Sequence, residues 1–310
     1  MLIEFHRAML ADRVRNAAFY EALRRVIVPG ATTVADIGCG TGLLAFMASR
    51  LGARQVHCYE HGEVIHLAER LGRANRIRNL VFYQEHSTAI LDPEPVDVVV
   101  SETLGNFAYE ENILETLRDA RRFLRPGGTL IPQQIEQYVA PVVSGRVQAE
   151  LEAWDQVGYG LDFAAAKALS LNNLYVRTIG PAELLDAPGS AQRWDRVELG
   201  GRAASVRTGQ ASWTLGRTVT VYGFALWWRC QLLPGVTLAT DPTGPATHWE
   251  QLYLPTLAPV RLARGDRLEL RLRSDTSAEG ATIRWQIGHR PAGSDRALIQ
   301  RLDMRRGDLG

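Results

Sequence analysis

The chain has 310 residues, with 35 Lys and Arg against 34 Asp and Glu, so its formal net charge at pH 7 is +1. This length exceeds what one core usually holds and predicts two structural units. The balanced charge excludes the basic surplus of a general nucleic-acid binder. Three unevenly spaced cysteines without a C-x-x-C pair exclude a disulfide framework and a zinc knuckle, so no metal is expected. With no secretory leader and no apolar run of about 18 to 20 residues, a soluble cytoplasmic protein without a membrane partner is expected.

Short apolar runs alternate with helical periods from about Thr32 to Pro132. The pattern predicts strands at 33–37, 55–60, 80–84, 96–100 and 125–131, and helices at 41–52, 63–77 and 110–124. Strand and helix in alternation are typical of a parallel sheet covered on both faces. The apolar runs are continuous, as strands buried on both faces require. Residues 1–132 are therefore expected to form an α/β, Rossmann-like domain.

The pattern changes after Pro132. Residues 217–228, 266–274 and 281–289 alternate apolar with polar side chains, and no long helical period separates them. This alternation is typical of antiparallel strands with one face in water. The residues expected to face inward are Leu268, Leu270 and Leu272, and those expected to face water are Arg267, Glu269, Arg271 and Arg273. Residues 133–310 are expected to form a second, antiparallel domain.

An insertion at about residues 146–187 interrupts this second domain. Its helical periods carry Trp154, Tyr159, Phe163 and the apolar stretch LLDA at 184–187, all expected to be exposed. Large apolar side chains left in water mark interaction surfaces. We interpret the insertion as an arm that docks on a second subunit in a closed dimer.

A glycine-rich loop directly follows the first strand, in the stretch VADIGCGTG at 34–42. Its glycines let a ligand approach the backbone closely where a helix begins. The G-x-G-x-G spacing, with an acid inside the strand, resembles the first motif of class I S-adenosylmethionine-dependent methyltransferases more than the G-x-G-x-x-G dinucleotide fingerprint. Glu60, at the end of the second strand, stands where an acid can accept hydrogen bonds from both ribose hydroxyls. The cofactor-binding residues in this part of the chain are Asp36, Gly38, Cys39, Gly40, Gly42 and Glu60.

Two glutamates nine residues apart follow the fourth strand. Glu102 ends the run VVVSE at the edge where open α/β sheets bind ligands, and the loop to Glu111 can fold back as a hairpin, so that both carboxylates face one pocket. Two close carboxylates repel each other, and one is protonated unless a cation lies between them. A guanidinium meets this need, because its planar donors match carboxylates bidentately. The pair predicts methylation of a guanidinium nitrogen, with catalysis by positioning and electrostatics.

Three separated motifs together resemble the protein arginine methyltransferase family. SETLGNFAYEE resembles the family's double-glutamate loop, with Glu111, not Glu110, at the second position. ATHWEQ resembles its Thr-His-Trp loop, carried by Thr247, His248 and Trp249. MLADRVRNAAFY, residues 9–20, resembles its N-terminal helix. The resemblance covers nearly the whole chain.

The resemblance implies roles for individual residues and a layout for the whole chain. Met9 would lie near the transferred methyl group, Asp12 would pair with His248, and Arg15 would hold the carboxylate of S-adenosyl-L-methionine. The turn EHST at 85–88 would contact the adenine through His86 and Ser87. The implied layout is a Rossmann-like domain, a cis-proline junction, a β-barrel-like substrate domain and a homodimer acting on an arginine-containing protein or peptide. The implied catalytic residues are Glu102, Glu111, His248, Asp12, Trp249 and Met9, and Glu102 also borders the cofactor.

Other readings stay open at this stage. The chain begins close to Met9, so we expect the family's tyrosine-rich lid to be missing. Thr103 and Ile113 occupy positions where the family usually has other residues. These differences leave the number of methyl groups open. A more open pocket would also serve a small guanidine or amine metabolite, or a biosynthetic peptide. A cofactor-binding scaffold would have no need of paired charges in a cleft, and a nucleic-acid methyltransferase would need a basic surface that is not evident.

Overall fold

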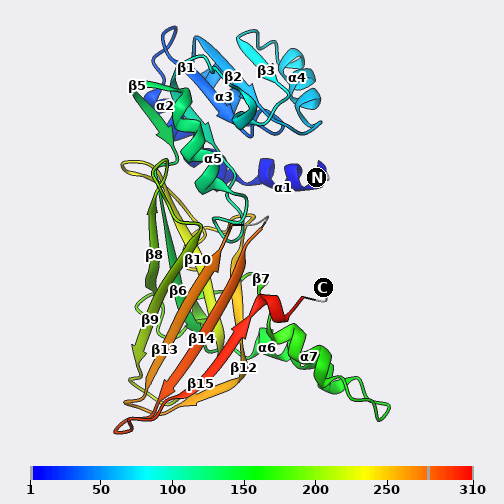
Figure 1. The fold of residues 1–310 in the computed structure, drawn as a ribbon, viewed down its shortest axis with the longest axis vertical. Coiled ribbons are helices and arrows are strands. Elements are labelled where there is room, and N and C mark those ends of the chain that lie inside the picture. Colours follow the sequence, from blue (N-terminus) through cyan, green and yellow to red (C-terminus); the bar gives the residue numbers. More distant parts are fainter. Residues whose placement is uncertain (1–2, 278–279, 309–310) are drawn as a thin grey trace.

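The structure is a computed structural model that describes residues 3–277 and 280–308. A parallel sheet with its helices lies at one end of the long axis, and a barrel-like pair of antiparallel sheets lies at the other (Figure 1). Helix α1 (Ile3–Ala11) lies between the two, and the arm projects to the side of the barrel. Within the described residues, no helix is both long and apolar enough to cross a membrane.

The parallel sheet has the strand order β3-β2-β1-β4-β5. Its strands are β1 (Thr33–Ile37), β2 (Gln55–Tyr59), β3 (Leu80–Tyr83), β4 (Val96–Ser101) and β5 (Leu124–Ile131). The chain order reverses between β1 and β4, where ligands bind in folds of this type. Ile37 is paired with Ser101 in register, so Gly38 and Glu102 leave the sheet side by side.

Helices cover both faces of this sheet. They are α2 (Arg13–Val26), α3 (Leu43–Arg50), α4 (Ile65–Ala74) and α5 (Ile113–Ala120), with the 3-10 turns η1 (Ser87–Ala89) and η2 (Arg121–Phe123). All five residues of β1 are buried. Val34 packs in one core with Phe19 and Leu23, whereas Ala35 packs in another with Phe123. Burial on both faces explains the continuous apolar runs, since each buried aliphatic side chain contributes roughly 1.5 to 3 kcal/mol.

The N-terminal segment corrects one expectation. A single helix was expected over residues 9–20, but the structure has α1 and α2, which meet at Asp12. Asp12 has an extended backbone, and its Oδ1 accepts a hydrogen bond of 2.9 Å from the amide of Arg15. It therefore caps α2 and turns α1 away, which a pattern of helical periodicity does not reveal.

The chain passes into the antiparallel region through a cis peptide bond between Ile131 and Pro132. One sheet has the order β7-β12-β10-β6-β8, with β11 beside β10, and the other has the order β15-β14-β13-β9. Leu268, Leu270 and Leu272 are at most 3% exposed, as their alternation predicts. The strands are β6 (Gln134–Val142), β7 (Tyr175–Arg177), β8 (Gln192–Glu198), β9 (Val206–Thr214), β10 (Val219–Leu233), β11 (Val236–Ala239), β12 (Gln251–Leu262), β13 (Arg267–Asp275), β14 (Thr282–Arg290) and β15 (Leu298–Asp303).

The arm is helical, as expected, but its apolar surface is smaller than predicted. It contains α6 (Arg146–Leu151), η3 (Glu152–Gln156), α7 (Ala164–Leu171) and η4 (Pro181–Glu183), and β7 returns it to the barrel. Tyr159 is exposed, whereas Phe163 is half-buried and stacks on Trp154. The LLDA stretch was wrongly expected in water: Leu184 and Leu185 are 5% and 4% exposed and pack within this chain.

Candidate active site

A cavity of about 720 Å³ opens at the carboxyl ends of β1, β2 and β4. Its volume is typical of ligand pockets, which enclose roughly 300 to 1,000 Å³. The predicted site residues that line it are Met9, Arg15, Asp36, Gly38, Cys39, Gly40, Glu60, His86, Ser87, Glu102, Glu111, His248 and Trp249. The structure thus brings together residues from α1, from α2, from the carboxyl edge of the parallel sheet and from the loop before β12. Asp12 and Gly42 do not line the cavity.

The glycine loop forms one wall. Gly40 has a φ of +53°, and a Cβ there would lie 3.3 Å from the ring of His6 on α1. The left-handed backbone of Gly40 favours glycine, and a Cβ would also crowd α1 through His6. Gly42 has a different explanation: its φ is +89°, and a Cβ would lie 2.7 Å from the ring of Phe46. The structure therefore explains Gly42 by helix packing at the start of α3.

Two acids stand next to this loop. The carboxylate of Glu60 accepts hydrogen bonds from the amides of Gly40, at 3.1 Å, and Gly62, at 2.8 Å. Asp36 is buried, and its Oδ2 accepts a hydrogen bond of 2.9 Å from the amide of Ala45. Its Oδ1 is buried without a partner among the described residues. Burial raises the pKa of Asp36 to about 7, against the effect of the Ala45 hydrogen bond. An unsatisfied buried oxygen beside a glycine cradle is suited to a polar ligand.

Arg15 and Glu102 form an ion pair on the floor of the cavity, with side chains 8% and 3% exposed. Nε of Arg15 donates to Oε2 of Glu102 at 2.6 Å, and Nη1 donates to Asn16 at 3.0 Å. The amide of Leu104 donates to the other oxygen of Glu102 at 3.1 Å. The sequence predicted Arg15 as a ligand for the cofactor's carboxylate and did not predict its contact with Glu102. The contact fixes the direction of the Glu102 carboxylate.

Glu111 and Glu110 have different surroundings. Glu111 lines the cavity and has no hydrogen-bond partner among the described residues. Desolvation inside the cavity, together with the charges of Glu102 and Glu110, raises the pKa of Glu111 to about 7. Glu110 instead accepts a hydrogen bond of 2.6 Å from the amide of Asn106 and packs against Gly105. The free carboxylate in the cavity is therefore that of Glu111.

Asp12 joins the N-terminal helices to the loop at residues 247–249. Its Oδ2 accepts a hydrogen bond of 2.9 Å from the amide of His248 and lies 2.9 Å from Nδ1 of the same residue. Burial acts to raise the pKa of Asp12, but hydrogen bonds from Arg15 and His248 outweigh it, so this pKa is lowered. The carboxylate is thus anionic and orients the imidazole.

The loop from Glu102 to Glu111 contains no paired strands: it is irregular as far as Gly105 and ends in a turn over residues 108–111, and the antiparallel domain holds its backbone. Trp249 donates from Nε1 to the carbonyl of Leu104 at 2.6 Å, and Trp228 donates to the carbonyl of Gly105 at 3.1 Å. Asn106 donates to the carbonyl of Trp249 at 2.5 Å. Sequence reasoning did not identify His6, Asn106 or Trp228. Asn106 lies within the double-glutamate motif, which could have pointed to it, whereas Trp228 resembles an ordinary core residue of a strand.

Comparisons with known sequences agree with this geometry. The chain matches the methyltransferase domain family over residues 34–128 and the arginine methyltransferase oligomerization subdomain over residues 134–287. Protein arginine N-methyltransferase 6 of Xenopus tropicalis is 30% identical over 266 residues, which cover 81% of this chain and 78% of the relative. The arginine N(omega)-methyltransferase of Streptomyces achromogenes subsp. streptozoticus is 30% identical over 279 residues, which cover 86% of this chain and 75% of the relative.

Solved structures share the whole fold. A chain of the Trypanosoma brucei PRMT1 enzyme-prozyme heterotetrameric complex with AdoHcy is 24% identical, with a TM-score of 0.86 over 97% of this chain and 98% of that one. Protein arginine methyltransferase 10 of Arabidopsis thaliana is 22% identical, with a TM-score of 0.81 over 98% of each chain. The α/β fold with an added antiparallel domain is confirmed. The motifs, the cavity and these relatives show that the chain belongs to the protein arginine methyltransferase family and uses S-adenosylmethionine.

Proposed function

We propose that this enzyme methylates a terminal nitrogen of an arginine side chain in a protein or peptide, with Glu102 and Glu111 as the groups that hold the guanidinium. The observation that carries the proposal is the position of both carboxylates in one cavity with the glycine loop. S-adenosylmethionine, when bound, supplies an electrophilic methyl group. The side chains fit it, because Arg15 offers a cation, Glu60 accepts hydrogen bonds, and Asp36 has an unsatisfied oxygen.

The two glutamates perform different tasks in this proposal. Glu102 forms an ion pair with Arg15 and is held in one direction by it and by the amide of Leu104. Glu111 is free to accept hydrogen bonds from the opposite edge of a guanidinium. Together they draw the positive charge toward the nitrogens they contact, which leaves electron density on the remaining nitrogen for attack. Bidentate pairing also restrains the guanidinium plane, and positioning of this kind is a large part of catalysis.

A proton leaves the guanidinium when the new N–C bond forms. His248 lines the cavity, and its ring is held by Asp12 through Nδ1. The pair can accept this proton, with Asp12 stabilising the imidazolium. Trp249 is buried and bonded to the carbonyl of Leu104, so we assign it a positioning role. Met9 lines the cavity on α1 and would lie against the methyl group.

The proposal is tested by transfer of labelled methyl from S-adenosylmethionine to arginine-containing peptides, followed by hydrolysis to identify the product. Methylarginine is expected from the wild type and not from Glu102→Gln. Glu63→Gln is the matched control, because the Glu63 side chain is 86% exposed and lies outside the cavity. Cofactor binding without transfer to any arginine compound would contradict the proposal.

A second candidate substrate is free arginine or another small guanidine. It is favoured by the Streptomyces relative, which is named an arginine N(omega)-methyltransferase and is as similar to this chain as the Xenopus enzyme. The same assay separates the two candidates. If free arginine is methylated with a lower KM than any peptide, the small guanidine is the substrate in place of a protein. The roles of Glu102 and Glu111 would stay the same.

We also propose a homodimer. The matching of an oligomerization subdomain supports self-association. In the arm, Tyr159 is 95% exposed, Leu161 is 63% exposed and Trp154 is 37% exposed. A second, mostly apolar cavity of about 550 Å³ lies on the N-terminal domain, lined by Leu10, Tyr20, Leu43, Phe46, Met47 and Leu71 among others. Two exposed apolar surfaces on one chain satisfy each other when two copies exchange arms about a twofold axis.

A cytoplasmic location is proposed for the same protein. Cys39, Cys58 and Cys230 are all free and buried, and none of them forms a disulfide within the described chain. Thiols of this kind are typical of proteins that work in a reducing compartment.

A further inference from the structure

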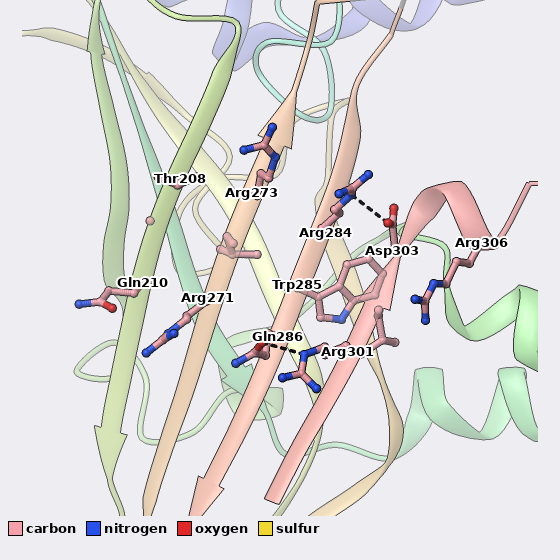
Figure 2. Close-up of a pocket in the computed structure, with 13 residues that line it drawn as sticks. Thr208, Gln210, Arg271, Arg273, Arg284, Trp285, Gln286, Arg301, Asp303 and Arg306 are labelled. Atoms are coloured by element: carbon pink, nitrogen blue, oxygen red, sulfur yellow. Dashed lines mark hydrogen bonds and ion pairs between the residues drawn. The ribbon is translucent and has the colours of Figure 1, made fainter. Parts of the chain in front are cut away.

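An arginine-rich surface lies on the barrel, away from the residues that form the catalytic cavity. It is concave, encloses about 600 Å³ and is built by the outer face of β9, β13, β14 and β15 with the 3-10 turn η5 (Met304–Arg306). We call it the arginine face and define it by Arg271, Arg273, Arg284, Arg301 and Arg306. Figure 2 shows these side chains spread across β13, β14, β15 and η5, with Thr208 and Gln210 at one border.

The charges of this face are not balanced. Asp303 is the acidic residue among its lining, and it pairs with Arg284 at 2.8 Å. Arg301 donates to the neutral amide of Gln286 at 3.1 Å. Within the part of the chain that the structure describes, Arg271 and Arg273 have no carboxylate at ion-pair distance. Elsewhere on the barrel, acids pair with Arg193, Arg196, Arg207, Arg217, Arg229 and Arg267, whereas Arg261 and Arg264 also have no carboxylate at ion-pair distance among the described residues.

The arginines of this face outnumber the acids beside them, which are Asp303 and, two residues along the strand from Arg273, Asp275. Arg273 lies directly opposite Arg284 in the register of β13 and β14. Like charges at directly opposite positions destabilise a sheet. The face is exposed, so packing of the core does not require arginine at these positions. An anionic ligand would remove this repulsion, and the planar guanidinium matches carboxylate oxygens bidentately.

The spacing of the face suits an extended peptide. Arg273 and Arg284 form one row across the strands, and Arg271 and Arg301, separated by Gln286, form the next row. Residues two apart on a strand are about 6.7 Å apart, which is also the spacing of alternate side chains on an extended peptide. Carboxylates at every second position of such a peptide therefore reach successive rows.

We propose that the arginine face docks an acidic segment of the substrate protein, at a distance from the arginine that is methylated. This rests on the proposed function, in which the substrate is a protein or peptide. Nucleic acid fits the face less well: the aromatic residue in its lining, Trp285, is 2% exposed, so the face offers no ring on which bases stack. The catalytic cavity, which carries Glu102 and Glu111, has the opposite charge and accepts the cationic side chain of the same substrate.

The test is binding of a short fluorescein-labelled peptide with Glu at alternate positions, measured by anisotropy, beside the same peptide with Gln for Glu and a single-stranded RNA. The wild type should bind the Glu peptide more tightly, and the affinity should fall as salt is raised. Arg271→Gln with Arg273→Gln should weaken binding roughly tenfold, because two charged hydrogen-bonding groups are lost. Arg261→Gln with Arg264→Gln is the matched control, since it removes the same charge from exposed arginines outside the face.

Equal binding of the Glu and Gln peptides, or unchanged binding by the Arg271/Arg273 variant, would overturn the proposal. RNA bound more tightly than the Glu peptide through the same arginines would replace the acidic segment by nucleic acid. The variant should still methylate a short arginine peptide that lacks acids, at the wild-type rate. Failure of the wild type to methylate any arginine compound would reject the proposed function. It would leave the anisotropy result unaffected, because that assay measures binding to the arginine face without methyl transfer.

Discussion

At the scale of single residues, the titration of Glu111 is a central property of the site. Its pKa is raised to about 7 because burial and two neighbouring carboxylates disfavour the charge. The anionic form is the one that receives a guanidinium. The raised pKa also means that the folded state holds a proton that the unfolded chain has released. Glu111 therefore makes the fold less stable as the pH rises from about 4.5, its ordinary value, toward 7.

The first prediction concerns pH. For the free enzyme, kcat/KM should rise with pH and level off above about 7, as Glu111 loses its proton. Glu110→Gln should move the midpoint to lower pH, because one of the repelling charges is removed while the hydrogen bond to Asn106 can be kept. The measurement is a pH profile of methyl transfer for both proteins. A midpoint that does not move would show that Glu110 does not influence the titration.

The second prediction concerns Asp12 and His248. Asp12→Asn should lower kcat at least about tenfold, because an uncharged amide no longer stabilises the imidazolium. Asn can still cap α2 through its side-chain oxygen, but its NH2 group cannot accept the hydrogen bond from the amide of His248, so the unfolding free energy should also fall, by about 1 to 3 kcal/mol. His248→Gln should have a similar effect on kcat, and the double variant should lose no more than either single one. Additive losses in kcat would mean that the two residues act independently.

At the scale of elements, the loop that carries the two glutamates, residues 102–111, is part of the N-terminal domain in sequence, but it makes contacts with both domains. It follows β4, yet Trp228 and Trp249 of the antiparallel domain bond to the carbonyls of Gly105 and Leu104. The loop can hold its acids only when the two domains are packed together. Domain packing therefore sets the geometry of catalysis.

The third prediction tests this coupling. Trp249→Phe leaves the buried carbonyl of Leu104 without its donor, and should cost about 1 to 3 kcal/mol of unfolding free energy together with a loss of kcat. Trp227→Phe is the matched control: Trp227 is 2% exposed and its Nε1 has no partner among the described residues, so this variant loses the same side-chain volume without breaking a hydrogen bond and should cost less unfolding free energy and leave kcat unchanged. Thermal unfolding and kcat are measured together. Equal effects of the two substitutions would reject the coupling.

At the scale of the whole molecule, the arm and the apolar cavity on the N-terminal domain account for the proposed dimer. The fourth prediction is that light scattering gives twice the chain mass at micromolar concentration. Tyr159→Ser with Leu161→Ser should yield a monomer. Its activity should be reduced, because the partner's arm no longer packs on α1 and on the apolar cavity of the N-terminal domain. Leu91→Ser, at a residue that is 95% exposed but outside the arm, should leave the dimer intact. A wild-type monomer would contradict the proposal.

The sequence by itself determined the strands and helices of the first domain from residue 33 onward, the change to antiparallel strands after Pro132 and the family. Two-sided burial makes the runs of β1 and β4 continuous, and one-sided burial makes β13 alternate, so local patterns reveal the layers. The double-glutamate spacing is also local, because the loop between the two acids is short. Each of these features depends on neighbours within a few residues.

Only the tertiary structure decided the contacts that join distant segments. Asp12 ends α1 because its carboxylate caps α2 and meets His248, a residue 236 positions away. Arg15 takes Glu102 as its partner, and Leu184 and Leu185 are buried where periodicity suggested a free surface. The physical reason is that ion pairs, buried hydrogen bonds and core packing depend on which segments meet in space. A pattern along the chain does not contain that information until the chain has folded.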